Sequence, residues 1–254
     1  MAKITVKNLC KSFRAPNGAP LEVIRNLSFE LEGGTFTAIL GPSGCGKSTL
    51  LNLLAGMDDP TEGRVLMDGK PIQDDRTLHI GFVFQEPRLL NWRTVKRNIM
   101  LPLEREKTER AQMEDRVRSK IELTGLAGYE DYYPLQLSGG MQQRVAIARA
   151  LVTDPDILLM DEPFSSLDEI TARKMRGELL RIWQETGKTV VFVTHDIAES
   201  VFLSQLILIV TQKPCTISSR VEVAVPYPRR YGDDPLFEIE KCALREFLKM
   251  DGAS

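Results

Sequence analysis

A glycine-rich segment between an apolar strand pattern and an apolar helix pattern restricts the fold of this chain more than any other feature. The segment fits the pattern G-x-x-x-x-G-K-[ST] and consists of Gly41, Pro42, Ser43, Gly44, Cys45, Gly46, Lys47, Ser48 and Thr49. An apolar run ending at Leu40 precedes it, and a leucine-rich helix pattern at residues 50–54 follows it. A strand, a glycine-rich loop and a helix in this order form the P-loop of α/β nucleotide-binding folds. A chance match is expected about once in a hundred chains of this length, so the segment predicts a nucleotide site.

Each residue type in this segment has a chemical reason. Glycines let the backbone N–H groups curl around phosphate oxygens, and the following helix adds the positive end of its dipole. Lys47 is expected to reach the terminal phosphates, and the Ser48 hydroxyl is expected to ligate Mg²⁺.

Two acidic residues, Asp161 and Glu162, directly follow a second apolar strand pattern at residues 157–160. In P-loop proteins an aspartate at this place holds the Mg²⁺. A second acid beside it could polarise a water molecule for attack on the terminal phosphate. One acid at a strand end is as often a surface carboxylate or a helix cap, but its combination with a P-loop favours the catalytic interpretation.

His195 follows a third apolar strand pattern, at residues 190–193. Ligand groups in open α/β sheets gather at the carboxyl ends of the strands, so the ends at Leu40, Met160 and Val193 should face one crevice. A lone histidine is usually structural, yet this position predicts contact with a terminal phosphate. His79 has no such context and is expected to be structural.

A small-residue turn at Ser138, Gly139 and Gly140 opens a helix pattern and offers a second set of exposed N–H groups. Taken alone, this turn is explained equally well as an ordinary helix cap and as a phosphate-binding site.

The composition of the whole chain limits its other functions. The 254 residues contain 33 Lys and Arg against 35 Asp and Glu, which gives no reason to expect nucleic acid as a ligand. Cys10, Cys45, Cys215 and Cys242 lack paired spacing, so we expect reduced thiols rather than a disulfide framework or a zinc site. The longest apolar run, Leu206–Val210, is far shorter than the roughly 20 residues that cross a bilayer. A soluble chain without a targeting segment is therefore expected.

Strand patterns at residues 4–6, 21–24 and 27–31 and an Asp68-Gly69 turn predict an antiparallel β region at the N-terminal end. Fully apolar short strands then alternate with helices, which predicts a parallel sheet covered on both faces. The charged stretch at 105–120 is interpreted as a solvated helix. We expect further helices at 169–185 and 235–250, the last after the proline-bearing linker 226–228.

A series of motifs resembles those of ABC ATPases in order and spacing, over residues 4–225. It consists of the P-loop, Gln85, the segment 137–143, Asp161-Glu162, Ser165-Ser166-Leu167-Asp168 and His195. The resemblance implies an α/β fold with a RecA-like P-loop NTPase core, an N-terminal antiparallel β subdomain and a helical insertion at about 86–136. The ATPase domain would then span 1–225, and 226–254 would form a C-terminal linker and helix. It also implies that ATP and Mg²⁺ bind, and that two copies form a head-to-tail homodimer around ATP.

The resemblance also implies the roles of individual residues. Glu162 would be the general base, His195 would contact the γ-phosphate, and Gln85 would sense Mg²⁺ and the attacking water. Asp161 would hold Mg²⁺ together with Ser48 and Gln85. Phe13 would stack on adenine, and the P-loop would hold the phosphates. Ser138 and Gly140 of the second copy would bind the γ-phosphate. The nucleotide site would also include Gly139, Gln142 and Asp168, and Asp168 would couple the two sites.

The segment 84–95, with residues 133–136, resembles the importer ATPases for nitrate, sulfonates and taurine. This chain departs from that branch at Asn91, where proline is usual, and at residues 212–215. The resemblance implies integral membrane permease subunits as partners, an external solute-binding protein as an indirect partner, and a peripheral place at the cytoplasmic face of the inner membrane. Arg88, Leu89, Leu90 and Trp92 are expected to dock on the permease, unless the apolar three pack the core of the insertion.

Other functions are compatible with the same motifs. An importer ATPase for another solute, such as a cofactor precursor, remains open. ABC ATPases outside transport usually carry coiled coils or two cassettes in one chain, and exporter ATPases are commonly fused to membrane helices. A module with a vestigial site would lack Lys47, Glu162 or His195, and all three are present.

Overall fold

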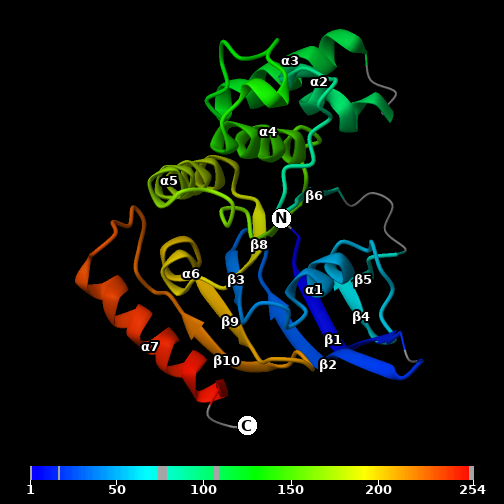
Figure 1. Ribbon diagram of the computed structural model, residues 1–254, viewed down its shortest axis with the longest axis vertical. Coiled ribbons are helices and arrows are strands. Elements are labelled where there is room, and N and C mark those ends of the chain that lie inside the picture. Colours follow the sequence, from blue (N-terminus) through cyan, green and yellow to red (C-terminus); the bar gives the residue numbers. More distant parts are fainter. Residues whose placement is uncertain (1, 17, 74–78, 106–108, 252–254) are drawn as a thin grey trace. The chain divides into compact units, whose positions relative to one another are not determined.

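The computed structural model describes residues 2–16, 18–73, 79–105 and 109–251 of the chain. The chain forms two compact units, and Figure 1 traces their elements. The first unit comprises Met1–Leu78 and Thr189–Ser254, and the second comprises His79–Lys188. The predicted insertion at 86–136 lies within the second unit.

An antiparallel sheet of order β2-β1-β4-β5 opens the first unit. Its strands are β1 (Ile4–Arg14), β2 (Pro20–Leu31), β4 (Glu62–Met67) and β5 (Lys70–Pro71). Asp68 and Gly69 connect β4 to β5 with φ angles of 48° and 80°, as a tight hairpin turn requires. This confirms the predicted antiparallel subdomain, although the two strand patterns at 21–31 belong to one strand.

The parallel strands of the first unit are buried on both faces. Strand β3 (Phe36–Leu40) pairs in parallel with β8 (Thr189–Thr194) and with β9 (Leu206–Val210), and β10 (Ile217–Glu222) pairs antiparallel with β9. Every residue of β3 and β8 is buried, which explains why their sequences are apolar runs without alternation.

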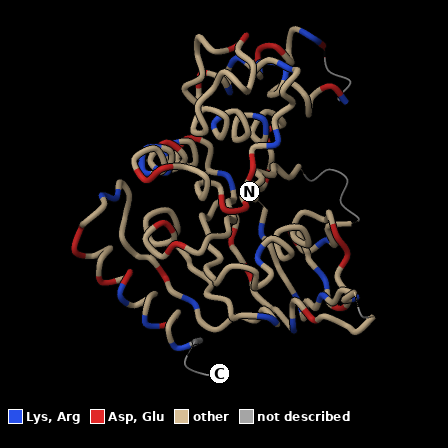
Figure 2. The backbone as a smooth tube through the Cα atoms, in the orientation of Figure 1, with Lys and Arg blue, Asp and Glu red and all other residues tan. Residues whose placement is uncertain are grey.

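In the described part of the first unit the helices are α1 (Lys47–Leu54), α6 (Ile197–Leu203) and α7 (Asp234–Asp251). Helix α6 packs on β3 and β8, and α7 packs on α6 and β10. Acidic and basic residues are interspersed along α7 (Figure 2), including ion pairs of Lys241 with Glu238 and of Lys249 with Glu246. The predicted C-terminal helix is thus confirmed.

The second unit combines two parallel strands with a helical core. Strands β6 (Ile80–Val83) and β7 (Ile157–Asp161) pair in parallel. The helices are α2 (Val95–Met100), η1 (Leu101–Arg105), α3 (Arg110–Leu123), η2 (Pro134–Gln136), α4 (Gly139–Leu151) and α5 (Glu169–Thr186). Buried residues of α2, α3 and α4 form one apolar cluster that includes Val95, Val117 and Val145. The charged stretch predicted as a helix corresponds to α3, apart from 106–108, which lie outside the described residues.

A buried asparagine holds the segment before α2. The Asn98 side chain accepts a hydrogen bond from the Leu90 N–H at 2.8 Å and donates to the carbonyls of Leu90, Arg93 and Thr94 at 2.9–3.1 Å. Because Asn98 is fully buried, these bonds satisfy its amide and fix the course of the chain from Leu90 to Thr94.

No helix in the described part of the chain has the length and apolarity that crossing a membrane requires.

Candidate nucleotide-binding and catalytic site

The P-loop follows β3, and its backbone packs closely against neighbouring side chains at two glycines. Gly46 has a φ of 119°, and a Cβ atom there would lie 2.8 Å from Cγ1 of Val23. A Cβ at Gly41 would lie 2.5 Å from Cγ2 of Val210. Side chains at these two positions would push the loop away from its neighbours, so glycine is needed at both.

Lys47 and the start of α1 give this loop its positive character. The side chain of Lys47 is buried, and its Nζ donates to the carbonyls of Gly41 and Pro42, each at 2.9 Å. Helix α1 begins at Gly46 with no side-chain cap and no acidic residue in its first turn. A glycine cradle, a helix N-terminus and a buried ammonium group suit phosphate oxygens, so the residues fit a nucleotide.

His195 is placed beside the P-loop within the first unit. Leu40 pairs with Thr194 in the parallel ladder, and the Gly41 N–H donates to the Thr194 carbonyl at 3.2 Å. The exposed His195 therefore follows a residue that is bonded to the first residue of the P-loop. Two of the three strand ends named in the sequence, those at Leu40 and Val193, therefore lie together within the first unit.

A hydrogen-bond network fixes the turn after His195. The Thr194 hydroxyl accepts from the Asp196 N–H at 3.0 Å and donates to the buried carboxylate of Glu199. The Asp196 carboxylate caps α6 by accepting from the Glu199 N–H at 2.9 Å. These bonds hold both sides of His195, so its position is set by the fold rather than by its own contacts alone.

Two buried thiols meet behind the P-loop. Cys45 lies within it, and Cys215 lies between β9 and β10, where its N–H donates to the Val23 carbonyl at 2.8 Å. A hydrogen bond from the Cys215 thiol, helped by the charge of Lys47, lowers the pKa of Cys45 to about 7. The same hydrogen bond and burial raise the pKa of Cys215. Sequence spacing offers no signal for this pair, because the two residues are far apart in the chain.

Phe13, predicted to stack on adenine, lies in β1 and is 42% exposed, so it is not a core residue. The Nζ of Lys11 lies 4.9 Å from the centroid of its ring. Asp58 holds that ammonium group at 2.6 Å.

Asp161, Glu162 and Gln85 occupy the carboxyl ends of the two strands of the second unit. Val83 pairs with Met160, so the chain leaves β6 and β7 at the same edge. The Gln85 side chain donates to the Ser165 hydroxyl at 3.2 Å, and that hydroxyl donates to the Glu162 carbonyl at 3.0 Å. Glu162 has a φ of 40°, an unusual conformation that marks a sharp turn directly after the strand. The structure thus brings Gln85 and the Glu162 turn together.

The segment 137–143 begins helix α4. Ser138 is exposed and caps the helix by accepting from the Met141 N–H at 3.3 Å. The Gln142 side chain donates to the carbonyls of Pro134 and Leu137 at 3.0 and 3.3 Å, which ties the preceding loop to the helix. Gly139 is exposed, and the first turn of α4 carries no acidic residue. The geometry leaves this helix N-terminus accessible to an anion.

Asp168 lies next to this helix within the second unit. It caps α5 by accepting from the Thr171 N–H at 3.0 Å, and hydrogen bonding from Thr171 lowers the pKa of the carboxyl. A Cβ atom at Gly140 would lie only 2.7 Å from Cγ2 of Thr171. Glycine at position 140 therefore lets the starts of α4 and α5 approach each other.

The predicted docking residues 88–92 divide into two groups. Leu89 packs against the helical core, and Arg88 lies over the ring of Phe84 at 4.3 Å. Trp92 is 73% exposed, so it does not pack the core. The Val95 N–H donates to the Tyr132 carbonyl at 2.8 Å, which places the loop of Trp92 beside a loop with the exposed aromatic residues Tyr129, Tyr132 and Tyr133. An exposed aromatic surface therefore lies around Trp92. It is formed with the nearby exposed tyrosines and not with Leu89, which the sequence had placed in the docking group.

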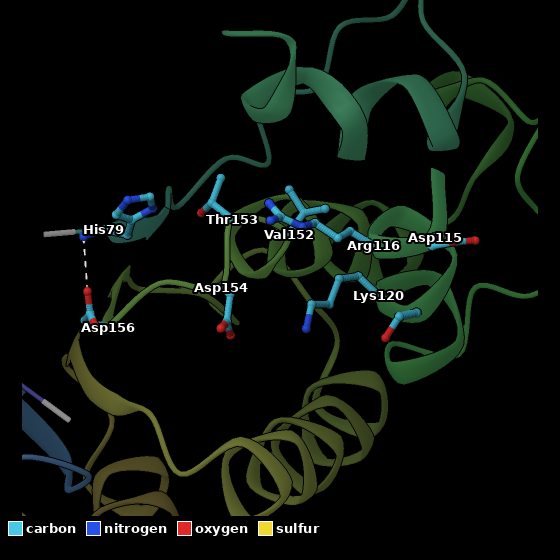
Figure 3. Close-up of a pocket in the computed structure, with 9 residues that line it drawn as sticks. His79, Asp115, Arg116, Lys120, Val152, Thr153, Asp154 and Asp156 are labelled. Carbon is cyan, nitrogen blue, oxygen red and sulfur yellow. Dashed lines mark hydrogen bonds between the residues drawn. The ribbon is translucent and has the colours of Figure 1, made fainter. Parts of the chain in front are cut away.

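A pocket of about 710 Å³ in the second unit is lined by none of the predicted nucleotide residues. Its lining residues include His79, Arg116, Lys120 and Asp154 (Figure 3). The His79 N–H donates to Asp156 at 3.2 Å, and the Asp156 N–H donates to the His79 carbonyl at 2.8 Å. Within the described ranges no three His, Cys, Asp or Glu residues cluster as metal ligands.

Comparisons with known proteins agree with this geometry. Residues 24–165 match the family model described as ABC transporter. The aliphatic sulfonates import ATP-binding protein SsuB of Bacillus cereus is 42% identical over 96% of this chain and 95% of its own length. The taurine import ATP-binding protein TauB of Ruegeria pomeroyi is 38% identical over 95% of this chain and 89% of its own. A solved dimeric ATP-binding cassette in a post-hydrolysis state, bound to ADP and Pi, is 34% identical with a TM-score of 0.76, covering 88% of this chain and 100% of the cassette.

Proposed function

Since this chain belongs to the ABC transporter family and is an ATPase that binds ATP with Mg²⁺, we propose that it energises the import of a small sulfonate across a membrane. The observation that carries the proposal is the similarity to sulfonate and taurine import ATP-binding proteins along nearly the whole chain. A similarity confined to the P-loop would support nucleotide binding but not a role in the import of a particular solute.

Hydrolysis proceeds by in-line attack of water on the γ-phosphate, and the protein contributes mainly position and charge. Lys47 and the N–H groups of the P-loop hold the phosphates. Glu162 accepts the proton of the attacking water, and His195 contacts the γ-phosphate. Ser48, Asp161 and Gln85 would hold Mg²⁺, which would neutralise the developing negative charge.

Two copies complete the catalytic site. Ser138, Gly139 and Gly140 of one copy bind the γ-phosphate held by the P-loop of the other, and Asp168 couples the two sites. The accessible N-terminus of α4 supports this role, because an unblocked helix N-terminus favours an anion. A related cassette that is dimeric and bound to ADP and Pi supports the assembly of two copies. ATP binding then closes the dimer and hydrolysis opens it.

Permease subunits dock on the second unit at the exposed aromatic surface around Trp92. Large exposed apolar side chains are unusual on a surface that contacts only water, and aromatic residues dominate the energetics of many interfaces. Gln85 lies in the same segment, and its bond to Ser165 links this surface to the turn of Glu162. The chain would work as a peripheral subunit at the cytoplasmic face of the membrane, with an external solute-binding protein delivering the solute.

Growth of cells that lack this subunit tests the solute class. An alkanesulfonate, taurine or nitrate is offered as sole sulfur or nitrogen source, and the gene is restored on a plasmid as the control. The proposal predicts that growth on a sulfonate fails and that the plasmid restores it. Normal growth on both sulfonates, with no second ATPase to substitute, would contradict the proposal. A defect on nitrate alone would assign a different anion, and a defect on none of the three would favour a solute such as a cofactor precursor.

A further inference from the structure

Cys45 and Cys215 are in contact although they come from distant parts of the chain. The two residues are 2% and 0% exposed, so both thiols are buried. Backbone geometry shows the same closeness, since a Cβ atom at Gly46 would lie 3.6 Å from Cβ of Cys215. Cys45 directly precedes Gly46, so Cys215 packs against the backbone next to Cys45, and two buried thiols placed in this way can form a disulfide after a small movement.

We propose that Cys45 and Cys215 form a reversible disulfide that turns off ATP binding when a hydroperoxide is present. The site is a thiol pair with one member inside the P-loop, so its oxidation acts directly on the nucleotide cradle. The inference rests on the role of the P-loop in binding ATP, and it is independent of which solute the transporter carries.

The reaction balances in two steps with hydrogen peroxide as the oxidant. The Cys45 thiolate attacks one peroxide oxygen, the O–O bond breaks, and hydroxide leaves as Cys45 becomes a sulfenic acid. The Cys215 sulfur then attacks the Cys45 sulfur, the S–O bond breaks, and the S–S bond forms. The thiol protons and the departing oxygens end as two molecules of water. The two sulfurs lose two electrons, which the peroxide gains.

The surroundings of the two sulfurs assign their order of reaction. The thiolate is the attacking form of cysteine, and a pKa of about 7 makes Cys45 partly thiolate at neutral pH. The raised pKa of Cys215 keeps that residue a thiol until the sulfenic acid has formed. Cys45 is thus the peroxide-reactive residue, and Cys215 is the resolving residue.

Bond formation must move the P-loop rather than Cys215. A disulfide is about 2.05 Å long, much shorter than a hydrogen bond between thiols. The backbone of Cys215 is held at 2.8 Å by the Val23 carbonyl and at 3.1 Å by the Arg25 N–H, within a bridge to Ile24. The P-loop therefore moves toward Cys215. A displacement of about 1 Å in a group that positions a substrate costs on the order of 10²-fold in rate.

The test treats the full-length reduced protein with hydrogen peroxide, then maps disulfides by mass spectrometry of a non-reduced digest. ATP affinity and ATPase activity are measured before oxidation, after it, and after dithiothreitol. We expect a peptide linkage between Cys45 and Cys215, a loss of activity of at least about ten-fold, and recovery on reduction. The matched control is the double variant Cys10→Ser/Cys242→Ser, which keeps the pair and should respond like the wild type.

Cys215→Ser removes the resolving thiol and should abolish both the linkage and most of the reversible loss. Peroxide inhibition of Cys215→Ser as fast and as reversible as in the wild type would overturn the proposal. So would oxidation of the wild type without the linkage. If Cys215→Ser fails to fold, mapping in the double variant decides the question. The ATPase activity of the wild type with reduced thiols is measured first. If this protein is inactive, the result contradicts the proposed function of the P-loop and not the disulfide.

Discussion

Arg229 anchors helix α6, which begins at Ile197 close behind His195, and its replacement should destabilise the first unit. Arg229 is 5% exposed, and its guanidinium donates hydrogen bonds of 2.7–3.1 Å to backbone carbonyls. These carbonyls belong to Val201, Phe202, Ser204, Val223 and Val225. The acceptors at 201–204 include carbonyls at the end of α6, which have no partner within the helix.

The magnitude follows from the carbonyls that Arg229→Met leaves without a donor. Each buried polar group left unsatisfied costs about 1–3 kcal/mol. Burial also lowers the pKa of Arg229, so methionine gains back part of the cost of desolvating the charge. We therefore expect a loss of about 3 kcal/mol, which lowers the Tm by roughly 6–12 °C in a chain of this size.

Scanning calorimetry measures this shift, and hydrogen exchange of the α6 amides locates it. Arg230→Met is the matched control, because Arg230 is exposed and its removal should change stability by no more than about 0.5 kcal/mol. An Arg229→Met protein that melts within about 2 °C of the wild type would refute the reasoning.

Three further predictions concern the nucleotide site and the docking surface. Lys47→Ala and Ser138→Arg should each be inactive, while a mixture should regain activity through one intact composite site per heterodimer; an active Ser138→Arg would show that the signature does not act across the dimer. Trp92→Ala should weaken co-purification with the permease by at least about ten-fold and spare basal ATPase; loss of nucleotide binding would instead assign Trp92 to folding. Alkylation of Cys45 should rise as the pH passes about 7, because only the thiolate reacts; a rate that is flat from pH 6 to 8 would contradict this, with the exposed Cys242 as the comparison.

The elements that the sequence predicted well depend on local chemistry. The strand before Gly41, the loop and α1 follow one another directly, and each has a strong pattern of its own. The same holds for β7 with Asp161 and for β8 with Thr194, since fully buried parallel strands are short apolar runs.

The missed elements depend on contacts between distant residues. Strand β6 contains Gly81, a poor strand residue, and a Cβ there would lie 2.6 Å from the carbonyl oxygen of Ala150. Helix α2 is too short to show a clear helical period, and Asn98 within it is explained only by its bonds to the preceding loop. Helix α6 and strand β10 were missed as well.

The candidate site shows the same division between local and distant information. Motif order was enough to identify the residues of the P-loop, Asp161, Glu162 and His195 as candidates. The bond from Gln85 to Ser165 and the contact of Cys45 with Cys215 required coordinates, because neither involves neighbours in the sequence.

The most direct test of the account is the behaviour of Glu162→Gln in the presence of Mg²⁺ and ATP. Glutamine keeps the size of the side chain and cannot accept the proton of the attacking water. We predict unchanged ATP affinity, turnover reduced by roughly 10²–10⁴-fold, and a stable dimer by light scattering that disappears when ATP is withdrawn. Near wild-type hydrolysis by Glu162→Gln, or a monomer at saturating Mg-ATP, would contradict the assignment of Glu162 as the general base of an ATP-closed dimer.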